Sequence, residues 1–316
     1  MAVESAQVSL QEITAAAERI RPYILPTPLL RGDALGPGAP WLKAENLQRT
    51  GSFKVRGALN AVIQLTDDQR TRGVITLSAG NHGQALAYAA QLFGIPCVVV
   101  IREDAQRTKL EAIAGFGAEI VLTPIASWQA RLEAEQARRG LHLVHPFDDD
   151  AVLNGQGTVG LEILAAMPGV ETIVVPVGGG GLISGVAVAA KSLRPRVRVI
   201  GVEPEGANVV SRSLALGHPV TLERIETVAD GLAPPYTRAR NLALVQRYVD
   251  HVVTVTDAAI LDALRGIAGK AKLVVEPGGA AAIAAMGTVA IEGPAVAILT
   301  GGNVDGAQLA QWLAMP

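Results

Sequence analysis

The stretch Thr50-Gly51-Ser52-Phe53-Lys54-Val55-Arg56-Gly57 places a lysine between a loop of small residues and a helix that we expect to begin near Arg56. A lysine whose flexible side chain is removed from water is a candidate amine nucleophile, able to form a Schiff base with an aldehyde. A single lysine at such a boundary is more often a surface residue that caps a turn. The meaning of Lys54 therefore depends on the rest of the chain.

The composition describes a globular protein without charged tracts. Its 316 residues, 49% of them hydrophobic, can fill one or two domains with a substantial core. The 27 basic and 29 acidic residues leave a formal charge of −2, and no polybasic segment supports binding to nucleic acid or a membrane surface. The one cysteine, Cys97, lies in an apolar run and is expected to be a buried thiol, which excludes a disulfide within the chain.

The first residues do not look like a targeting signal. Residues 1–20 are amphipathic and carry acidic side chains, unlike the charged-then-apolar order of a signal peptide. No uncharged run approaches the length of a membrane span. We therefore expect a cytoplasmic protein with neither a membrane partner nor a nucleic-acid partner.

Short apolar runs alternate with alanine-rich helical segments from residue 74 onward. The alternation predicts βαβ units around parallel sheets, and continuously apolar runs predict strands covered by helices on both faces. An N-terminal helix is expected over residues 4–21. The expected strands are residues 74–77, 97–101, 119–122, 141–144, 172–175, 197–200, 252–255 and 295–299, and further helices are expected near 81–93, 106–116 and 126–139.

The runs form two blocks, around residues 70–145 and 170–316, which predicts an α/β fold with two lobes. Each lobe is expected to be a mostly parallel, open twisted sheet flanked by helices. In such folds a ligand binds in the crevice beyond the carboxyl ends of the strands. Small or polar residues follow several expected strands, as in Ser78-Ala79-Gly80-Asn81 and Thr300-Gly301-Gly302-Asn303.

Four consecutive glycines, Gly178 to Gly181, follow an expected strand and open a helix at Leu182. Backbone amides without Cβ atoms at the positive end of a helix can hold a phosphate, although a tight turn would use one or two of these glycines. The order Gly179-x-Gly181-x-x-Ser184, with Glu203 after the next strand, also approaches a dinucleotide-binding fingerprint. A nicotinamide-dependent oxidoreductase would leave the lysine stretch unexplained, so it remains the distant alternative.

Ser78-Ala79-Gly80-Asn81-His82-Gly83 lies where a strand turns into a helix. Free amides at a helix start, with a hydroxyl and a side-chain amide, suit a carboxylate, but an ordinary helix cap uses the same residue types. Two histidines, His142 and His145, precede an acidic run and invite a metal interpretation. Three residues apart on a strand, they point to opposite faces, so we do not expect them to share one zinc ion.

Taken together and in order, these segments resemble the fold-type II pyridoxal-phosphate enzymes, of the tryptophan synthase β-like fold, and within them the serine/threonine dehydratase and serine racemase group. The resemblance runs from near residue 22 to near residue 305. The matching stretches are Lys43 to Gln48, Thr50 to Gly57, Ser78 to Gln84, Gly155 to Thr158, Pro176 to Leu182, Ala229 to Gly231, Glu276-Pro277 and Thr300 to Asn303.

The resemblance implies a role for each matching residue. Lys54 would carry pyridoxal 5′-phosphate as a Schiff base and later remove the α-proton of the substrate, and Phe53 would pack near the pyridine ring. Asn81 would bind the 3′-oxygen, and Thr300 stands where the family commonly has a serine facing the pyridine nitrogen. The phosphate would be held by Gly178, Gly179, Gly180, Gly181 and the Leu182 amide, and the substrate carboxylate by Ser78 with the turn residues Ala79, Gly80, Asn81 and His82.

The hydroxyl of Thr300 has a chemical consequence within this resemblance. A neutral hydroxyl does not hold a proton on the ring nitrogen, so the ring is a weaker electron sink. This favours prompt loss of a β-hydroxyl over reactions that need a long-lived carbanion. By family analogy, the cofactor phosphate would give the departing hydroxyl its proton.

Two departures from the family pattern refine the expectation. The racemases that this chain resembles carry serine before Gly-Asn-His, whereas Ala79 cannot transfer a proton to the opposite face of the carbanion, so dehydratase activity should exceed racemase activity. Some relatives bind a divalent cation at positions that are Glu203, Ala207 and Val209 here, so one carboxylate is missing. Glu203 and Ala207 would serve a cation only with help from water.

The sequence thus predicts a pyridoxal-phosphate-dependent ammonia-lyase that converts L-threonine and/or L-serine to 2-oxobutyrate or pyruvate. A serine racemase and a 3-hydroxyaspartate dehydratase are the alternatives within the family, and a cofactor-binding protein without catalysis is an alternative outside it. We expect residues 1–66 with 148–316 to form a large cofactor-binding domain and residues 67–147 a small mobile substrate-binding domain. We also expect no regulatory domain after the catalytic region and assembly into a homodimer or homotetramer.

Overall fold

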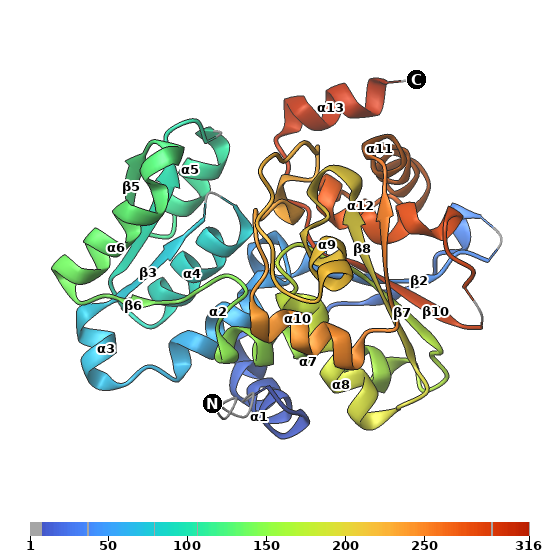
Figure 1. Cartoon of the computed structure of the whole chain (residues 1–316), viewed down its shortest axis with the longest axis horizontal. Coiled ribbons are helices and arrows are strands. Elements are labelled where there is room, and N and C mark those ends of the chain that lie inside the picture. Colours follow the sequence, from blue (N-terminus) through green and yellow to red (C-terminus); the bar gives the residue numbers. More distant parts are fainter. Residues whose placement is uncertain (1–7, 37, 79, 106, 292, 316) are drawn as a thin grey trace.

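Two separate β-sheets organise the computed structural model, which describes residues 8–36, 38–78, 80–105, 107–291 and 293–315. We call the six-stranded sheet with its helices the large lobe and the four-stranded sheet with its helices the small lobe. Figure 1 shows the two lobes side by side, with the small lobe on the left. Both sheets are mostly parallel and flanked by helices, which confirms the predicted α/β class.

The large sheet has the strand order β1-β2-β10-β7-β8-β9. Strand β1 runs antiparallel to β2, and every other neighbouring pair is parallel. The strands are β1 (Leu29–Leu30), β2 (Trp41–Ala44), β7 (Thr172–Pro176), β8 (Arg198–Pro204), β9 (His251–Val255) and β10 (Ala295–Leu299).

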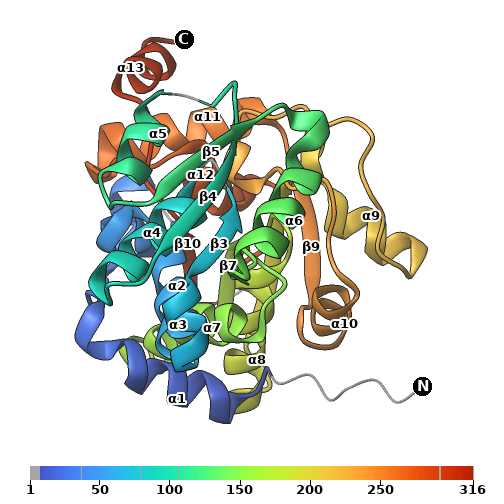
Figure 2. The same ribbon diagram turned by 90° about the vertical axis from the view of Figure 1, so that its left-hand side faces the viewer.

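The small sheet is parallel throughout, with the order β5-β4-β3-β6. Figure 2, which faces the small lobe, shows α4 and α5 on one side of this sheet and α6 on the other. The strands are β3 (Val74–Leu77), β4 (Cys97–Arg102), β5 (Glu119–Thr123) and β6 (His142–Leu143).

Thirteen α-helices cover the sheets in the part of the chain that the structure describes. Their bounds are α1 (Leu10–Ile20), α2 (Lys54–Ile63), α3 (Asp67–Arg72), α4 (Asn81–Leu92), α5 (Arg107–Ala114), α6 (Trp128–Arg139), α7 (Asp150–Ala166), α8 (Gly181–Leu193), α9 (Val209–Leu216), α10 (Ala239–Tyr248), α11 (Asp257–Gly266), α12 (Pro277–Ala284) and α13 (Gly306–Ala314).

Both faces of the large sheet are buried, which explains its continuously apolar strands. Along β7, Ile173 and Val175 belong to the hydrophobic core on one face, while Val174 between them belongs to the core on the other. Successive side chains of a strand point to opposite faces, so a strand between two helix layers needs apolar residues at every position.

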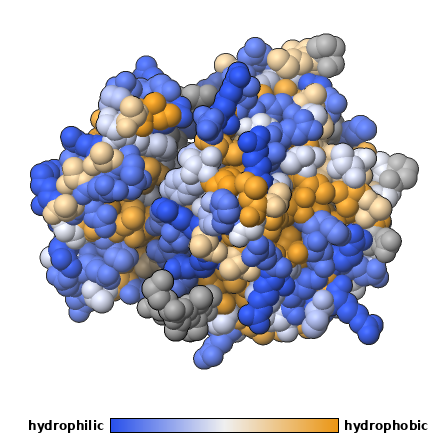
Figure 3. All heavy atoms as spheres, viewed as in Figure 1, coloured by the Kyte–Doolittle hydropathy of each residue, from blue (hydrophilic) through white to orange (hydrophobic). Residues whose placement is uncertain are grey.

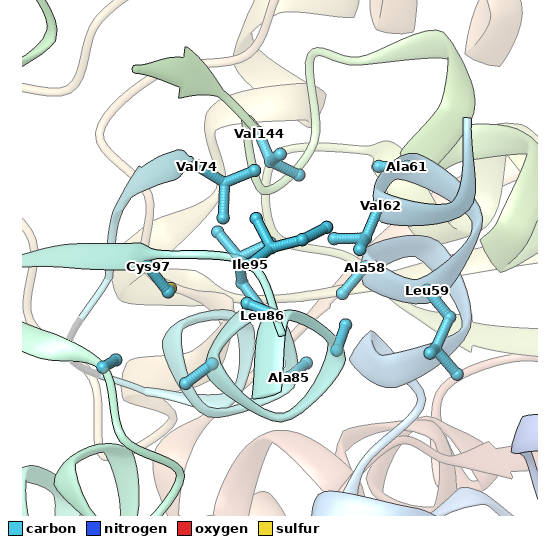
Figure 4. Close-up of a cluster of buried hydrophobic side chains, with 14 of the residues drawn as sticks. Ala58, Leu59, Ala61, Val62, Val74, Ala85, Leu86, Ile95, Cys97 and Val144 are labelled. Carbon is cyan, nitrogen blue, oxygen red and sulfur yellow. The ribbon is translucent and has the colours of Figure 1, made fainter. Parts of the chain in front are cut away.

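Helix α2 connects the two lobes through its side chains. Val55, Ala58 and Val62 join Leu86 and other residues of the small lobe in one hydrophobic core (Figure 4). The opposite side of α2 packs against α7 of the large lobe. Residues 54–63 therefore pack against both lobes.

Most differences between the expected and observed elements are a few residues at the ends. Strands β3 and β10 match their predicted bounds, whereas β8 continues to Pro204. Helix α2 begins at Lys54 itself, two residues before Arg56, because Phe53 already has helical backbone angles. The predicted helix over residues 4–21 begins in the structure at Leu10, and its residues 4–7 lie outside the described part of the chain.

The surface in Figure 3 is mainly hydrophilic over the small lobe, with a larger apolar area on the large lobe. Among the described residues, no helix has both the length and the apolar character needed to cross a lipid bilayer. Cys97 is a free thiol in β4 and is 8% exposed, as expected for a core residue. Burial raises its pKa to about 12.

Candidate active site

A cavity of about 1010 Å³ lies between the lobes, where the carboxyl ends of β3, β7 and β10 meet. The outline in Figure 3 is notched where the two lobes adjoin. Ala79, also predicted for the substrate site, lies outside the described residues. The other predicted cofactor and substrate residues all line this cavity, namely Phe53, Lys54, Ser78, Gly80, Asn81, His82, Gly178, Gly179, Gly180, Gly181, Leu182 and Thr300.

Lys54 is the first residue of α2, and its side chain faces the cavity. Its Nζ donates a hydrogen bond to the carbonyl oxygen of Pro146 (2.9 Å) and lies 5.3 Å from the centre of the Phe53 ring. Burial lowers the pKa of the Lys54 amine to about 8, while the nearby carboxylate of Glu276 acts in the opposite direction. A lysine with a lowered pKa has more of its amine uncharged near neutral pH, which is the form that attacks an aldehyde.

The turn before Lys54 is fixed by the end of β10. Thr50 has a left-handed backbone (φ 59°), and its carbonyl accepts a hydrogen bond from the side chain of Asn303 (2.7 Å). The backbone N–H of Phe53 donates to the carbonyl of Thr300 (3.1 Å). These contacts hold the amine nucleophile beside the residue that follows β10.

Gly178 to Gly180 lie in the turn between β7 and α8, with Gly180 in a left-handed conformation (φ 91°), and Gly181 is the first residue of the helix. A Cβ on Gly179 would come within 2.5 Å of the Phe147 ring, so this position has no room for a side chain. Asn241 and Thr237 donate hydrogen bonds to the Gly179 carbonyl (2.8 and 3.0 Å), which fixes the peptide orientation. The turn and the first amides of α8 therefore form a cradle that suits a phosphate group.

Thr300 follows β10 and is 4% exposed. Its Oγ1 lies 3.3 Å from the Gly278 carbonyl, to which it donates a hydrogen bond. The donor at this position is therefore neutral. The carboxylate of Glu276 is held elsewhere in the cavity, where it accepts a hydrogen bond from Asn81 Nδ2 (2.6 Å). Burial, followed by the neighbouring Asp230, raises the pKa of Glu276 to about 7.

The segment after β3 brings polar groups from the small lobe. Ser78 Oγ accepts a hydrogen bond from the Gly80 amide (3.2 Å), and Asn81 opens α4. The side-chain oxygen of Asn81 accepts from Asn303 (2.7 Å), so Asn81 contacts the large lobe through both ends of its amide. The His82 ring donates through Nε2 to the Val144 carbonyl (3.0 Å), and burial lowers its pKa to about 3.

A buried ion network that the sequence reasoning missed lies behind Lys54. Arg56 is fully buried and forms hydrogen-bonded ion pairs with Glu45 (2.8 Å) and Glu162 (2.6 Å). Lys43 of β2 reaches the same Glu162 carboxylate (2.5 Å). Two cations and two anions thus join β2, α2 and α7 at the base of the site. The signal in the sequence was an arginine among the small and apolar residues that follow Lys54.

Other groups in the cavity also escaped the sequence reasoning. Glu276 and Asp230 were recognised only as parts of matching stretches, and His145 only as a possible metal ligand. Tyr236 lies in an irregular segment and gave no signal at all. Each of these side chains acquires its place through contacts with residues more than fifty positions away.

Glu203 and Ala207, which were considered for a metal ion, and Glu203 also for a ribose, lie away from the cavity. Glu203 is fully buried and caps α9, accepting hydrogen bonds from the amides of Val210 and Ser211 (2.8 Å each) and from the Ser211 hydroxyl (2.6 Å). Ala207 is buried, and neither residue lines the cavity. Within the described residues, no cluster of three histidine, cysteine or acidic side chains has the arrangement of a metal site.

One cavity thus brings together a desolvated amine, a glycine cradle with no room for a Cβ at Gly179, and a neutral hydroxyl. These features suit a phosphorylated aldehyde cofactor. Comparison with known families agrees: the model of the pyridoxal-phosphate dependent enzymes matches residues 20–301. The chain belongs to this family, and pyridoxal phosphate is its cofactor. The nicotinamide-dependent alternative is therefore wrong.

Known proteins similar to the chain include both lyases and racemases. An L-threonine ammonia-lyase of Thermotoga maritima is 41% identical over 306 residues, which cover 94% of this chain and 76% of that protein. The crystal structure of T.th. threonine deaminase is 40% identical, with a TM-score of 0.89 over 94% of this chain and 99% of that one. Maize serine racemase is 38% identical, with a TM-score of 0.91 over 96% of both chains.

Proposed function

We propose that the protein catalyses β-elimination of L-threonine and/or L-serine, releasing ammonia and 2-oxobutyrate or pyruvate. Similarity to proteins named threonine ammonia-lyase and threonine deaminase, at about 40% identity over most of the chain, supports the substrate class. The observation that carries the proposal is the buried Lys54 amine, whose pKa is lowered to about 8 by burial, on the same cavity as the glycine turn.

Pyridoxal phosphate supplies an aldehyde that joins amines and a conjugated ring that withdraws electrons from the substrate. In our proposal the amides of Gly178 to Gly181 and Leu182 bind its phosphate, Phe53 packs beside its ring, and Thr300 faces the ring nitrogen as a neutral partner. Asn81 donates to the 3′-oxygen through the second N–H of its side-chain amide, since the first donates to Glu276 and the amide oxygen accepts from Asn303.

Lys54 holds the cofactor and then removes the α-proton of the substrate. The Ser78 hydroxyl and the amides of Gly80, Asn81 and His82 bind the substrate carboxylate at the start of α4. This orients the α-proton toward the large lobe, where Lys54 begins α2. The Cβ–O bond then breaks, and water leaves from the β-carbon.

Serine racemase is the second candidate, because the maize racemase is nearly as similar as the threonine deaminase. The sequence argument against it is Ala79, which has no proton to donate where the racemases carry serine. A 3-hydroxyaspartate dehydratase remains a further member of the group. Stereochemical analysis of the recovered substrate separates a lyase from a racemase.

Lys54→Ala tests the proposal, with Lys270→Ala as its control because Lys270 is exposed and outside the cavity. We expect Lys54→Ala to abolish 2-oxo acid release from L-threonine and L-serine and to lose the visible cofactor band that borohydride also removes. The control should keep both properties. Retained elimination in Lys54→Ala, or wild-type racemisation as fast as elimination, would contradict the proposal.

The domain organisation and assembly also belong to the proposal. We infer that residues 67–147 move as a small substrate-binding domain against residues 1–66 with 148–316, closing the cavity between them. We further infer a cytoplasmic homodimer or homotetramer. Hydrogen exchange with and without substrate tests the movement, and light scattering in solution tests the assembly. A monomer, or equal exchange in both states, would overturn the corresponding inference.

A further inference from the structure

The cavity wall carries a hydrogen-bonded pair, His145 and Tyr236, to which the proposed mechanism gives no task. His145 follows β6, and Tyr236 lies in the irregular segment after the short helix η7 (Asp230–Leu232). Both side chains line the cavity that contains Lys54.

The protonation of His145 follows from its backbone partners. Its Nδ1 accepts hydrogen bonds from the amides of Phe147 (3.3 Å) and Asp148 (2.9 Å), so this nitrogen carries no proton. Burial, with the positive charges of Arg238 and Lys54, lowers the pKa of His145 to about 4. The imidazole is therefore neutral near pH 7, and its proton is on Nε2.

That tautomer determines the direction of the hydrogen bond to Tyr236. Nε2 of His145 lies 3.4 Å from the Tyr236 hydroxyl and, because it carries the proton, must be the donor. The tyrosine oxygen is then an acceptor in this bond, and its own proton remains free. Among the described residues, no carbonyl or carboxylate accepts a hydrogen bond from that hydroxyl.

The Tyr236 ring is held firmly beside the glycine turn. It packs at 5.6 Å between ring centres against Phe147, the residue that leaves no room for a Cβ on Gly179. The Arg238 guanidinium also lies over the ring, 4.6 Å from its centre. Tyr236 also forms a backbone bridge with Thr221. A hydroxyl held this way loses little freedom when it binds a ligand.

We propose that the Tyr236 hydroxyl binds the β-oxygen of the substrate and gives it the proton with which it leaves as water. The inference rests on the proposed function, because it assigns the proton donor for that elimination. It also favours substrates with a β-hydroxyl group, whose oxygen can accept this hydrogen bond. His145 is a positioning residue that acts through Tyr236.

The step balances within the site. The Cα–H bond breaks and its proton goes to Lys54, while its electron pair forms the second bond between Cα and Cβ. The Cβ–O bond breaks, its electron pair leaves with the oxygen, and the oxygen takes the Tyr236 proton. The phenolate then recovers a proton from the Lys54 ammonium through water in the cavity. A phenol is a stronger acid than water, so it assists the departure of hydroxide.

The test compares leaving groups in Tyr236→Phe. Chloride leaves β-chloro-L-alanine without a proton, whereas the hydroxyl of threonine needs one. We expect kcat for L-threonine and L-serine to fall roughly a hundredfold, and kcat for β-chloro-L-alanine to change less than about threefold. Tyr248→Phe, in α10 and outside the cavity, is the control and should leave both unchanged.

A second variant examines His145. In His145→Asn the side-chain oxygen can still accept from the amides of Phe147 and Asp148, but the donor to Tyr236 is lost. We expect the same selective loss on hydroxyl substrates, smaller than in Tyr236→Phe. Nitrogen-15 NMR of the wild-type histidines should show His145 with an unprotonated Nδ1 from pH 6 to 8, a result that does not depend on activity.

The outcomes separate the two levels of inference. Equal losses on hydroxyl and chloride substrates would show that Tyr236 supports packing alone. No loss on threonine would leave the cofactor phosphate as the donor. Either result overturns the inference and leaves the proposed function intact. If the wild type releases no 2-oxo acid from any of the three substrates, the proposed function fails and this inference fails with it.

Discussion

The two lobes use the same ion-pair chemistry in opposite surroundings. In the large lobe, Arg56 is fully buried between Glu45 and Glu162. In the small lobe, Arg139 joins Glu119 of β5 (2.5 Å), half of whose side chain is exposed, and Glu135 of α6 (2.8 Å), while 26% of the arginine side chain is itself exposed. When one partner of an ion pair is removed, water cannot reach a buried charge that is left behind. An exposed charge is solvated at once, so its loss of a partner costs little. The comparison indicates that the large-lobe network fixes the base of the site, while the small-lobe network is partly open to water.

One helix from each lobe shows a similar contrast. Of the thirteen residues of α8 in the large lobe, ten are buried, whereas in α5 of the small lobe only Ile113 is buried. A layer with few buried side chains opens locally at lower free energy. We therefore expect α5 to open locally more easily than α8.

The largest expected effect comes from breaking the buried network. Arg56→Met fills the volume but leaves Glu45 without its cation in a fully buried place. We expect the free energy of unfolding to fall by about 3–5 kcal/mol. Urea unfolding measures it, with Arg139→Met as the matched variant in the small lobe, where we expect the midpoint to move little. Equal losses in the two variants would remove the distinction between the lobes.

The next effect compares a glycine on each wall of the cavity. Gly179→Ala puts a Cβ within 2.5 Å of the Phe147 ring, while a Cβ on Gly80 meets no atom within 4 Å. We expect Gly179→Ala to destabilise the protein by about 1–3 kcal/mol and to release the cofactor during dialysis. Gly80→Ala should change stability by no more than about 0.5 kcal/mol. Thermal melts and the visible band measure both, and full cofactor retention in Gly179→Ala would show that the turn adapts.

The smallest expected effect is a shift in the pH at which the cofactor-free protein recombines with pyridoxal phosphate. Glu276 raises the pKa of Lys54 against the larger effect of burial, so removing its charge in Glu276→Gln should lower that pKa below about 8. The uncharged amine then forms at lower pH. We expect the pH profile for recombination of the cofactor-free protein with pyridoxal phosphate to move to lower pH. Glu203→Gln, a buried glutamate outside the cavity, is the control. A profile that moves upward or stays in place would contradict the assignment.

The architecture could be predicted because local patterns determine it. Strand β10 needs apolar residues at every position, and that run alone located Ala295–Leu299. Lys54 and the glycine turn were found in another way, because their short motifs became specific only together and in order with the other segments that resemble the family. Their shared cavity agrees with the expected crevice, while their individual roles remain predictions.

The rest of the site depends on packing that no local pattern carries. The partner of Asn81 is Glu276, 195 residues away, and the partner of Arg56 in α7 is Glu162, 106 residues away. Tyr236 lies in a segment without periodicity, and its importance rests on a histidine tautomer set by two backbone amides. Such properties arise only after the chain has folded.

The lone sulfhydryl of Cys97 in β4 offers one practical consequence. Because the chain has a single cysteine and that cysteine is in the small lobe, a thiol reagent added to the native protein reacts at one known place. Its rate of labelling reports how often the sheet around Cys97 opens, since the closed form both covers the sulfur and disfavours the thiolate. The native sequence therefore contains its own chemical probe for the dynamics of one lobe, without any engineered residue.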